Sequence, residues 1–258
     1  MDNITILKNG VPYNVPGNLQ IKDDVFVLRS DAKDKAFAHG GIDIADGKIK
    51  IKVIRIEGTV YLQPTEATRA SYLTLVQAIK AAFCQTDYML YLGSDHFIMI
   101  NKALKFSEEY LDAHDYQGAK FTIDLLAIDP FWYYDDEQEK TQIVTSTPKS
   151  FVVNNQGYVE TFPVITITAT GTLPDFTLEN ETDVQESGDG LKFRYTDPGL
   201  FIGNVVVIDC KEGTVKRGAT NYIRYFAGAF LKLLPGNNTL TYTGADCTVK
   251  VAWFERLF

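Results

Sequence analysis

The residue types that most often hold metals or act in catalysis are sparse in this 258-residue chain and do not cluster. Its three histidines, His39, His96 and His114, show no metal-ligand spacing among themselves or with nearby carboxylates. The sequence also lacks a nucleophile elbow, a Walker loop and a dinucleotide-binding fingerprint. We therefore expect no catalytic, cofactor-binding or metal-binding residues and no cofactor.

One acidic run and one aromatic run leave alternatives open. Asp135-Asp136-Glu137 has the residue types of paired glycosidase carboxylates, but general acid catalysis requires one carboxyl in a desolvated pocket. A solvated linker is the favoured reading. Phe131-Trp132-Tyr133-Tyr134 could stack on a sugar ring or on a partner. The favoured reading is an aromatic plug that closes the core of a first domain.

The cysteines predict core thiols rather than a redox or metal site. Cys84, Cys210 and Cys247 follow no CxxC or Cys/His ligand spacing. In a reducing compartment they should be free thiols that pack as small hydrophobic side chains. A Cys210–Cys247 disulfide is the alternative, if both side chains face inward on adjacent strands.

The net charge argues against nucleic acid as a specific partner, and the hydropathy argues against a membrane. Residues 1–150 carry 16 Lys and Arg against 21 Asp and Glu, and residues 151–258 carry 9 against 12. Both halves are acidic, so neither offers the basic face that specific nucleic-acid binding requires. No apolar run is long enough to span a bilayer, and residues 1–10 do not resemble a signal peptide. We expect synthesis in a cytoplasm and no membrane contact.

A lysine-rich strand gives the only candidate contact residues. Residues 48–53 alternate Lys with Ile or Val, which predicts a half-buried strand that presents Lys48, Lys50 and Lys52 on one face. The phase slips at Val53-Ile54, where a β-bulge would keep both apolar sets inward. The favoured reading of the lysines is a solvated, edge-protecting ladder. The alternative is a contact with an acidic neighbouring subunit.

One helix is predicted over residues 65–83, because Tyr72, Val76, Ile79 and Phe83 recur at helical spacing. Leu73, Leu75 and Ala82 should join this apolar stripe, and Thr65 is the expected N-cap, followed by Glu66 in the first turn. The stripe should pack on a sheet as part of the core.

The remaining segments read as strands on both sides of one boundary. Strands are expected at residues 88–92, 96–106 and 119–128, then at 164–168, 205–208, 239–242 and 247–254. The segment 135–150 is charged and then rich in Thr, Ser and Pro, so we expect an exposed linker. The chain should therefore have a domain at residues 1–140 and an all-β domain at residues 150–258.

Several fragments, in order, resemble siphophage distal tail proteins. The IDPFWY stretch at residues 128–133 is similar to the family's A-x-DPFWY domain end. Residues 162–167 resemble its PVI-x-I strand, and residues 207–215 resemble its VIDC…G-x-V hairpin. PGNNTLTY at residues 235–242 is similar to its PGxNTITY close. The resemblance spans roughly Gly40 to Phe258.

The resemblance implies a mainly β fold. It implies an N-terminal β-sandwich or barrel-like domain with one α-helix, related to tail-tube proteins, and a C-terminal galectin-like β-sandwich. It further implies a non-enzymatic virion protein of the tail tip or baseplate. Copies would form a hexameric ring, single or stacked, between the tail tube protein and the tail-fibre or receptor-binding proteins. DNA would pass through the lumen, which an acidic chain would not bind.

Two other classes stay open. A carbohydrate-binding β-sandwich module would need Trp132 or Trp253 exposed as a flat stacking platform. A β-sandwich hydrolase would need two carboxylates in a cleft.

Overall fold

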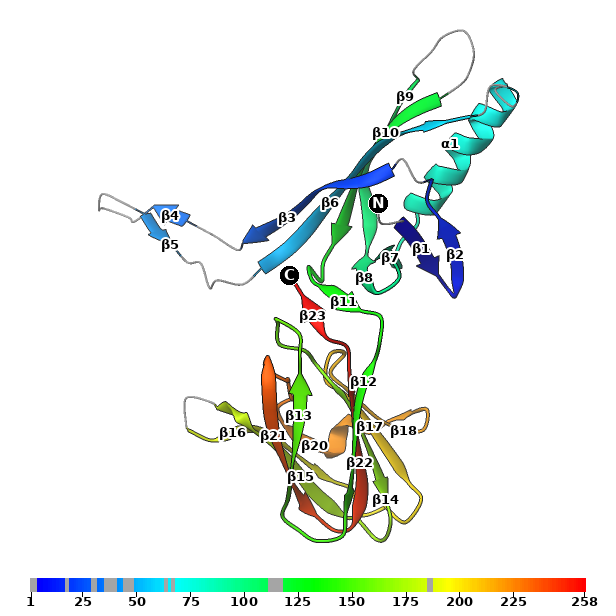
Figure 1. Cartoon of the computed structure of the whole chain (residues 1–258). Coiled ribbons are helices and arrows are strands. Elements are labelled where there is room, and N and C mark those ends of the chain that lie inside the picture. Colours follow the sequence, from blue (N-terminus) through cyan, green and yellow to red (C-terminus); the bar gives the residue numbers. More distant parts are fainter. Residues whose placement is uncertain are drawn as a thin grey trace. The chain divides into compact units, whose positions relative to one another are not determined.

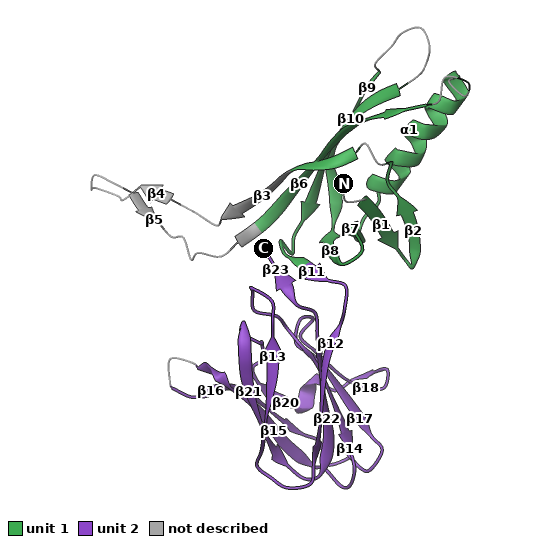
Figure 2. Cartoon of the chain, viewed as in Figure 1, with its two compact units in different colours: residues 1–132 green, residues 133–258 purple. Residues whose placement is uncertain are grey.

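The computed structural model describes residues 4–16, 19–28, 32–34, 41–43, 49–62, 65, 68–110, 118–184 and 188–258; between residues 23 and 50 it describes backbone only. The chain divides into two compact units, residues 1–132 and 133–258 (Figure 2). Each unit is described separately below, with the element labels of Figure 1.

The first unit combines short antiparallel sheets with one helix among its described residues. Its elements are β1 (Ile4–Lys8), β2 (Val11–Asn14), β3 (Leu19–Leu28), β4 (Ala32–Asp34), β5 (Gly41–Asp43), β6 (Ile49–Tyr61), α1 (Arg69–Phe83), β7 (Tyr88–Leu92), β8 (His96–Ile100), β9 (Lys102–Tyr110) and β10 (Gly118–Ala127). The boundary between the units falls within β11 (Trp132–Tyr134).

A four-stranded sheet in the order β3-β6-β10-β9 forms one side of the core of the first unit. The alternating side chains Phe121, Ile123 and Leu125 of β10 are fully buried, as are Ile54 and Ile56 of β6. Helix α1 packs against β9 and β10. The mainly β fold with one helix that was expected for this part of the chain is confirmed.

Strands β2, β1, β7 and β8 are neighbours in that order in a second sheet. Lys8 pairs with Val11, so Asn9 and Gly10 alone form the turn of the β1–β2 hairpin. Both turn residues have positive φ, 51° and 76°. Asn-Gly is the dipeptide that best tolerates this mirror-image turn, whose twist matches that of the strands.

The predicted apolar stripe of the helix is confirmed: Tyr72, Val76, Ile79, Ala82 and Phe83 are all buried. Of the other two leucines assigned to it, Leu75 is half-buried and Leu73 is exposed.

The helix begins later than expected, which corrects the predicted N-cap Thr65. Thr68 caps the helix, because its hydroxyl oxygen accepts a hydrogen bond of 3.1 Å from the backbone N–H of Ser71. Glu66 lies outside the described residues.

The β-bulge predicted at Val53-Ile54 was also wrong. Strand β6 pairs with β10 without interruption from Tyr61 to Lys52, so the phase does not slip. Lys52 lies on the same face as Ile54 and Ile56 and is fully buried. Its ammonium nitrogen lies 5.8 Å from the centre of the Trp132 ring, a cation–π contact that replaces part of its hydration.

The second unit is a two-sheet β-sandwich, as predicted for this half of the chain. Its elements are β12 (Gln138–Val144), β13 (Lys149–Asn155), β14 (Val164–Ala169), β15 (Asp175–Val184), β16 (Gly190–Thr196), β17 (Val205–Asp209), β18 (Thr214–Arg217), β19 (Thr220–Asn221), the 3₁₀ turn η1 (Ile223–Tyr225), β20 (Phe226–Gly228), β21 (Gly236–Gly244), β22 (Cys247–Trp253) and β23 (Arg256–Leu257). The six-stranded sheet has the order β12-β22-β14-β17-β18-β19, and the five-stranded sheet β13-β21-β15-β16-β20.

Inward-facing side chains from both sheets form one hydrophobic core. It includes Ile165, Ile167, Val206, Ile208, Leu240, Tyr242, Val249 and Val251, each fully buried. Along each strand these residues alternate with more exposed ones, which is the period that a sandwich requires.

The linker predicted at residues 135–150 was wrong for most of its length. Gln138–Val144 is strand β12, which pairs residue for residue with β22, and β13 begins at Lys149. Strand β12 lies at a sheet edge, and most of its side chains are exposed. Exposed edge strands carry charged and polar residues, so the amino-acid composition of β12 resembles that of a linker. The run at residues 96–106 is likewise two strands, β8 and β9, separated at Asn101.

Candidate assembly surfaces

The structure describes only part of the lysine ladder formed by Lys48, Lys50 and Lys52. The sequence predicted this ladder as a solvated face or a subunit contact. Lys48 lies outside the described residues, and the side chain of Lys50 is not described. Lys52 is buried against Trp132, so the ladder does not extend to it. A subunit contact through Lys48 and Lys50 stays a prediction.

The candidate chemical residues do not converge. Within the described ranges, no group of three or more His, Cys, Asp or Glu side chains could hold a metal ion. His96 lies beside Asp95, 3.1 Å between Nδ1 and Oδ1, whereas His39 and His114 lie outside the described residues. Asp135, Asp136 and Glu137 are exposed and lack the desolvated pocket that general acid catalysis needs.

A sugar-stacking platform is not formed by either tryptophan. Trp132 is 7% exposed and Trp253 is 6% exposed. Both rings are therefore packed inside, as the aromatic-plug interpretation predicts for Trp132. The carbohydrate-binding alternative loses the one feature it required.

The aromatic run fastens the beginning of the second unit to its end. The Tyr133 hydroxyl accepts a hydrogen bond of 2.9 Å from the Lys211 ammonium. The Tyr133 ring also lies 4.8 Å from that ammonium and 5.6 Å from the guanidinium carbon of Arg256. The backbone N–H of Tyr134 donates a hydrogen bond to the carbonyl of Glu255 at 3.1 Å.

A shallow groove of about 630 Å³ lies on the surface of the first unit. It lies between the β1–β2 hairpin and one face of α1, and most of its walls are apolar. The helix presents only small side chains there, so a neighbouring side chain could enter the groove. The lining residues are Ile6, Lys8, Asn9, Val11, Tyr13, Ala78, Ala81, Ala82 and Gln85.

A stack of alternating cationic and aromatic groups reaches the surface of the second unit. Asp197, whose side chain is 3% exposed, pairs with Arg217 at 2.9 Å. Arg217 donates a hydrogen bond of 2.8 Å to the Tyr222 hydroxyl, and its guanidinium carbon lies 4.4 Å from the centre of that ring. Tyr222 stacks on Tyr225 at 5.6 Å between ring centres, and exposed Arg224 lies 4.7 Å from the Tyr225 ring.

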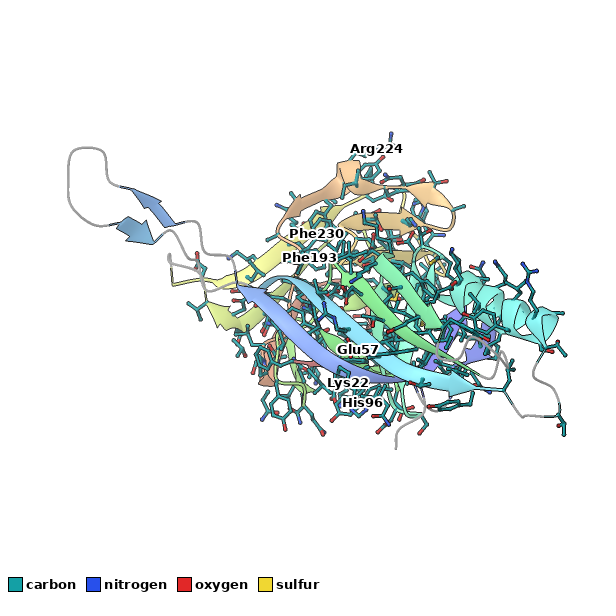
Figure 3. The ribbon with its side chains drawn as sticks, turned by 90° about the horizontal axis from the view of Figure 1, so that it is seen from above. Lys22, Glu57, His96, Phe193, Arg224 and Phe230 are labelled. Atoms are coloured by element: carbon teal, nitrogen blue, oxygen red, sulfur yellow. The ribbon has the colours of Figure 1, made fainter. Side chains whose placement is uncertain are left out.

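The base of this stack is buried at Asp197, and its outer end is exposed at Arg224. Figure 3 labels Arg224 at the periphery of the view and Phe230 and Phe193 nearer its middle. Phe230 stacks on Phe226, which in turn stacks on Phe193 of the core. Tyr and Arg are among the side chains that most often carry the binding energy in protein interfaces.

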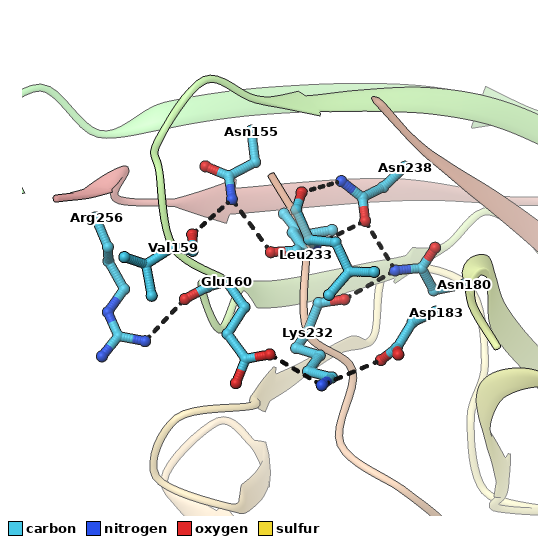
Figure 4. Close-up of polar contacts among 10 residues, drawn as sticks. Asn155, Val159, Glu160, Asn180, Asp183, Lys232, Leu233, Asn238 and Arg256 are labelled. Atoms are coloured by element: carbon cyan, nitrogen blue, oxygen red, sulfur yellow. Dashed lines mark hydrogen bonds and ion pairs between the residues drawn. The ribbon is translucent and has the colours of Figure 1, made fainter. Parts of the chain in front are cut away.

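Three buried asparagines, which no sequence motif singled out, hold the segment that leads into β21. Asn155, Asn180 and Asn238 are fully buried. The Asn155 amide donates to the Leu233 carbonyl at 3.2 Å, and the Asn180 amide donates to the Lys232 carbonyl at 2.8 Å and to Asn238 Oδ1 at 3.1 Å (Figure 4). Asn238 signals its role only through the Pro-Gly-Asn-Asn turn.

An ion-pair cluster lies beside these amides. The Lys232 ammonium contacts the carboxylates of Glu160 at 2.9 Å and Asp183 at 3.9 Å. The hydrogen bond to Glu160 raises the pKa of Lys232, although partial burial opposes this. The amides and the ion pairs together stabilise an irregular stretch of backbone.

The three cysteines are free thiols in differing environments. Cys84 is exposed, whereas Cys210 and Cys247 are buried and do not form a disulfide. Burial raises the pKa of the Cys210 thiol to about 12 and also raises that of Cys247. Because only the thiolate reacts readily, the buried thiols should be inert.

Titration with a thiol reagent at mildly alkaline pH should therefore label one cysteine per native chain and three per unfolded chain. Cys84→Ser should abolish the native reaction. Rapid labelling of two or more thiols in the native protein would contradict the burial of Cys210 and Cys247.

Among the described residues, no helix has the length and apolar character needed to cross a membrane. Residues 156–257, which make up most of the second unit, match the family model described as "Siphovirus-type tail component, C-terminal domain". No curated protein sequence matches the chain significantly.

Similarity to solved structures covers the whole chain. The SPP1 Dit protein, described as a paradigm of the hub adsorption apparatus in phages that infect Gram-positive bacteria, is 14% identical, with a TM-score of 0.73 over 99% of both chains. A chain of the phage P2 baseplate in its activated conformation with calcium is 8% identical, with a TM-score of 0.43 over 98% of both chains. Only the first of these similarities is close enough to show a shared fold.

The family model thus matches the second unit, and the Dit fold extends over both units. The family-model match and the shared fold bear out the resemblance to siphophage distal tail proteins that the sequence motifs indicated.

Proposed function

We propose that this chain forms a hexameric ring that joins the tail tube to the tip or baseplate of a siphophage. The single observation that carries the proposal is the Dit fold over 99% of both chains. The solved relative is described as part of a hub adsorption apparatus. A hub contacts a tube on its axis and adsorption proteins at its periphery, and a closed ring serves both contacts.

The two units would divide this work. The first, predicted from the sequence as residues 1–140, makes the ring and contacts the tail tube protein. The second, predicted as residues 150–258, holds tail-fibre or receptor-binding proteins. The protein would act in the virion tail tip after synthesis in the host cytoplasm. Its role is structural rather than enzymatic, and DNA would pass the acidic lumen without specific binding.

The groove of the first unit is where this proposal can be tested by mutation. A closed ring requires two different patches on each copy, one of which fits the other. The groove is hollow and mostly apolar, so it suits a protruding side chain from the next copy. Ala81 is an exposed helix position on its wall.

Ala81→Arg should reduce the six-chain species to single chains, because a bulky charge fills the groove. Mass photometry and negative-stain images of the purified protein would measure this. Leu73→Arg is the matched control: it adds the same charge at an exposed position on the same helix, two turns from Ala81 and outside the residues that line the groove. Wild-type protein without rings, alone or with tail tube protein, would contradict the proposed function.

A further inference from the structure

Strand β13 forms one edge of the five-stranded sheet of the second unit. All seven of its residues pair with β21, from Lys149↔Tyr242 to Asn155↔Gly236, without a register shift. Among the described strands, β13 has no partner on its other side. Its outer backbone groups are therefore available to another strand.

The edge of β13 lacks the features that normally prevent strand addition. Such features are charged side chains, proline, bulges and short length. After Lys149, β13 reads Ser-Phe-Val-Val-Asn-Asn, with no charge, no proline and no glycine. Val152 is 50% exposed in the middle of this run.

The other edges in the described sheets do carry protection. Strand β9 has two lysines and two glutamates, β3 has the charged run Lys-Asp-Asp, β12 has Glu139 and Lys140, and β2 has Pro12. Strands β19 and β20 contain only two and three residues. The unprotected edge of β13 is thus a local exception, which suggests that another chain covers it.

The sequence of β13 is compatible with itself in one antiparallel register. With Val152 opposite Val152 of a second copy, Ser150 lies opposite Asn154 and Phe151 opposite Val153 of that copy. Buried residues then meet buried residues, and exposed residues meet exposed residues. Lys149 lies opposite Asn155, so no like charges face each other although each chain has a net charge of −8.

We propose that β13 pairs antiparallel with β13 of a second copy, centred on Val152, and joins two five-stranded sheets into one. The pairing covers the exposed Val152 side chains with each other. It also continues the inner row of Phe151 and Val153 across the two copies.

This two-fold contact is of a different kind from the contacts of a ring. Neighbours in a closed six-fold ring make heterologous contacts, whereas a β13 pair is isologous. Where rings form, the pair would join copies from two rings. One short strand pair is weak, but several pairs between the same two rings would act together.

Cysteine cross-linking on the full chain tests the register. In a Cys84→Ser background, Val152→Cys should form a disulfide-linked species of twice the chain mass on a non-reducing gel after mild oxidation. In the proposed pair the two Cα atoms lie about 5 Å apart, within disulfide reach. Cys210 and Cys247 are buried and leave little background.

Ser150→Cys is the matched control at another exposed position of β13. In the same register its two copies lie about 13 Å apart along the strand, which is too far for a disulfide. The double variant Ser150→Cys/Asn154→Cys should cross-link again.

The proposal is overturned if Val152→Cys stays monomeric on the gel, or if Ser150→Cys cross-links equally well. The first result would also be expected if a strand of another tail protein covers this edge. Ring formation is measured separately by imaging, so either idea can fail while the other stands.

Discussion

An Ile79→Asp variant should lose the folded first unit. Ile79 is fully buried on the face of α1 that packs against the sheet. A carboxylate there would be removed from water without a partner, at a cost of roughly 4 kcal/mol or more. That approaches the roughly 5–15 kcal/mol that stabilises a typical domain.

Hydrogen exchange measured by mass spectrometry would locate the effect. Peptides from α1 and β10 should lose protection, whereas peptides from β14 and β22 should keep it. Gln77→Asp introduces the same group at an exposed position of the same helix and should leave exchange unchanged. Full protection of α1 in the Ile79→Asp protein would show that this face is not part of a packed core.

An Arg217→Ala variant should destabilise the second unit by about 3 kcal/mol, because it leaves the nearly buried Asp197 carboxylate without its cation. The melting temperature of that unit should fall by about 10 °C in calorimetry. The variant also removes the hydrogen bond to the Tyr222 hydroxyl, so the exposed Tyr225–Arg224 end should become mobile.

Arg194→Ala provides the comparison, because it breaks a second Arg–Asp pair in the same unit. The Arg194 and Asp175 side chains are 61% and 39% exposed. Hydrogen bonding from Arg194 lowers the pKa of Asp175, but solvent screens the pair and its loss should barely change the melting temperature. Equal effects of the two variants would mean that burial does not distinguish these pairs.

The sequence was most informative where one periodicity governs a whole element. Tyr72, Val76, Ile79 and Phe83 predicted the buried helix face, and strand β7 begins and ends at the predicted residues. Helical and strand periods act over a few neighbouring residues, so local reading suffices there. The family motifs added the order of the fragments, which the family model and the fold confirm.

Prediction from neighbouring residues failed where pairing with a strand distant in sequence decides whether a side chain is buried or a segment is a strand. Lys52 looked solvated because lysine usually is, but uninterrupted pairing with β10 directs it to the buried face beside Trp132. Strand β12 looked like a linker because one of its sides faces solvent and the other pairs with β22, more than a hundred residues later.

The cation–aromatic stack and the buried asparagines could not be predicted from the sequence for the same reason. Asp197, Arg217 and Tyr222 carry no shared motif, and they meet only because β18 and the following turn return beside the end of β16. Asn155 and Asn180 likewise become recognisable only through the carbonyls that they contact.

The pairing of β12 with β22 has a mechanical consequence. The chain enters the second unit at Tyr133 and reaches β12 at Gln138, and β12 pairs with β22 over seven consecutive residues. Tension that pulls β12 along its own axis would load these hydrogen bonds in shear, so that they share the force instead of opening one after another. Lys211 and Arg256 hold the Tyr133 ring just before that strand and would take the first part of the strain. The second unit should therefore resist extension at its entry point better than peeling at its other edges.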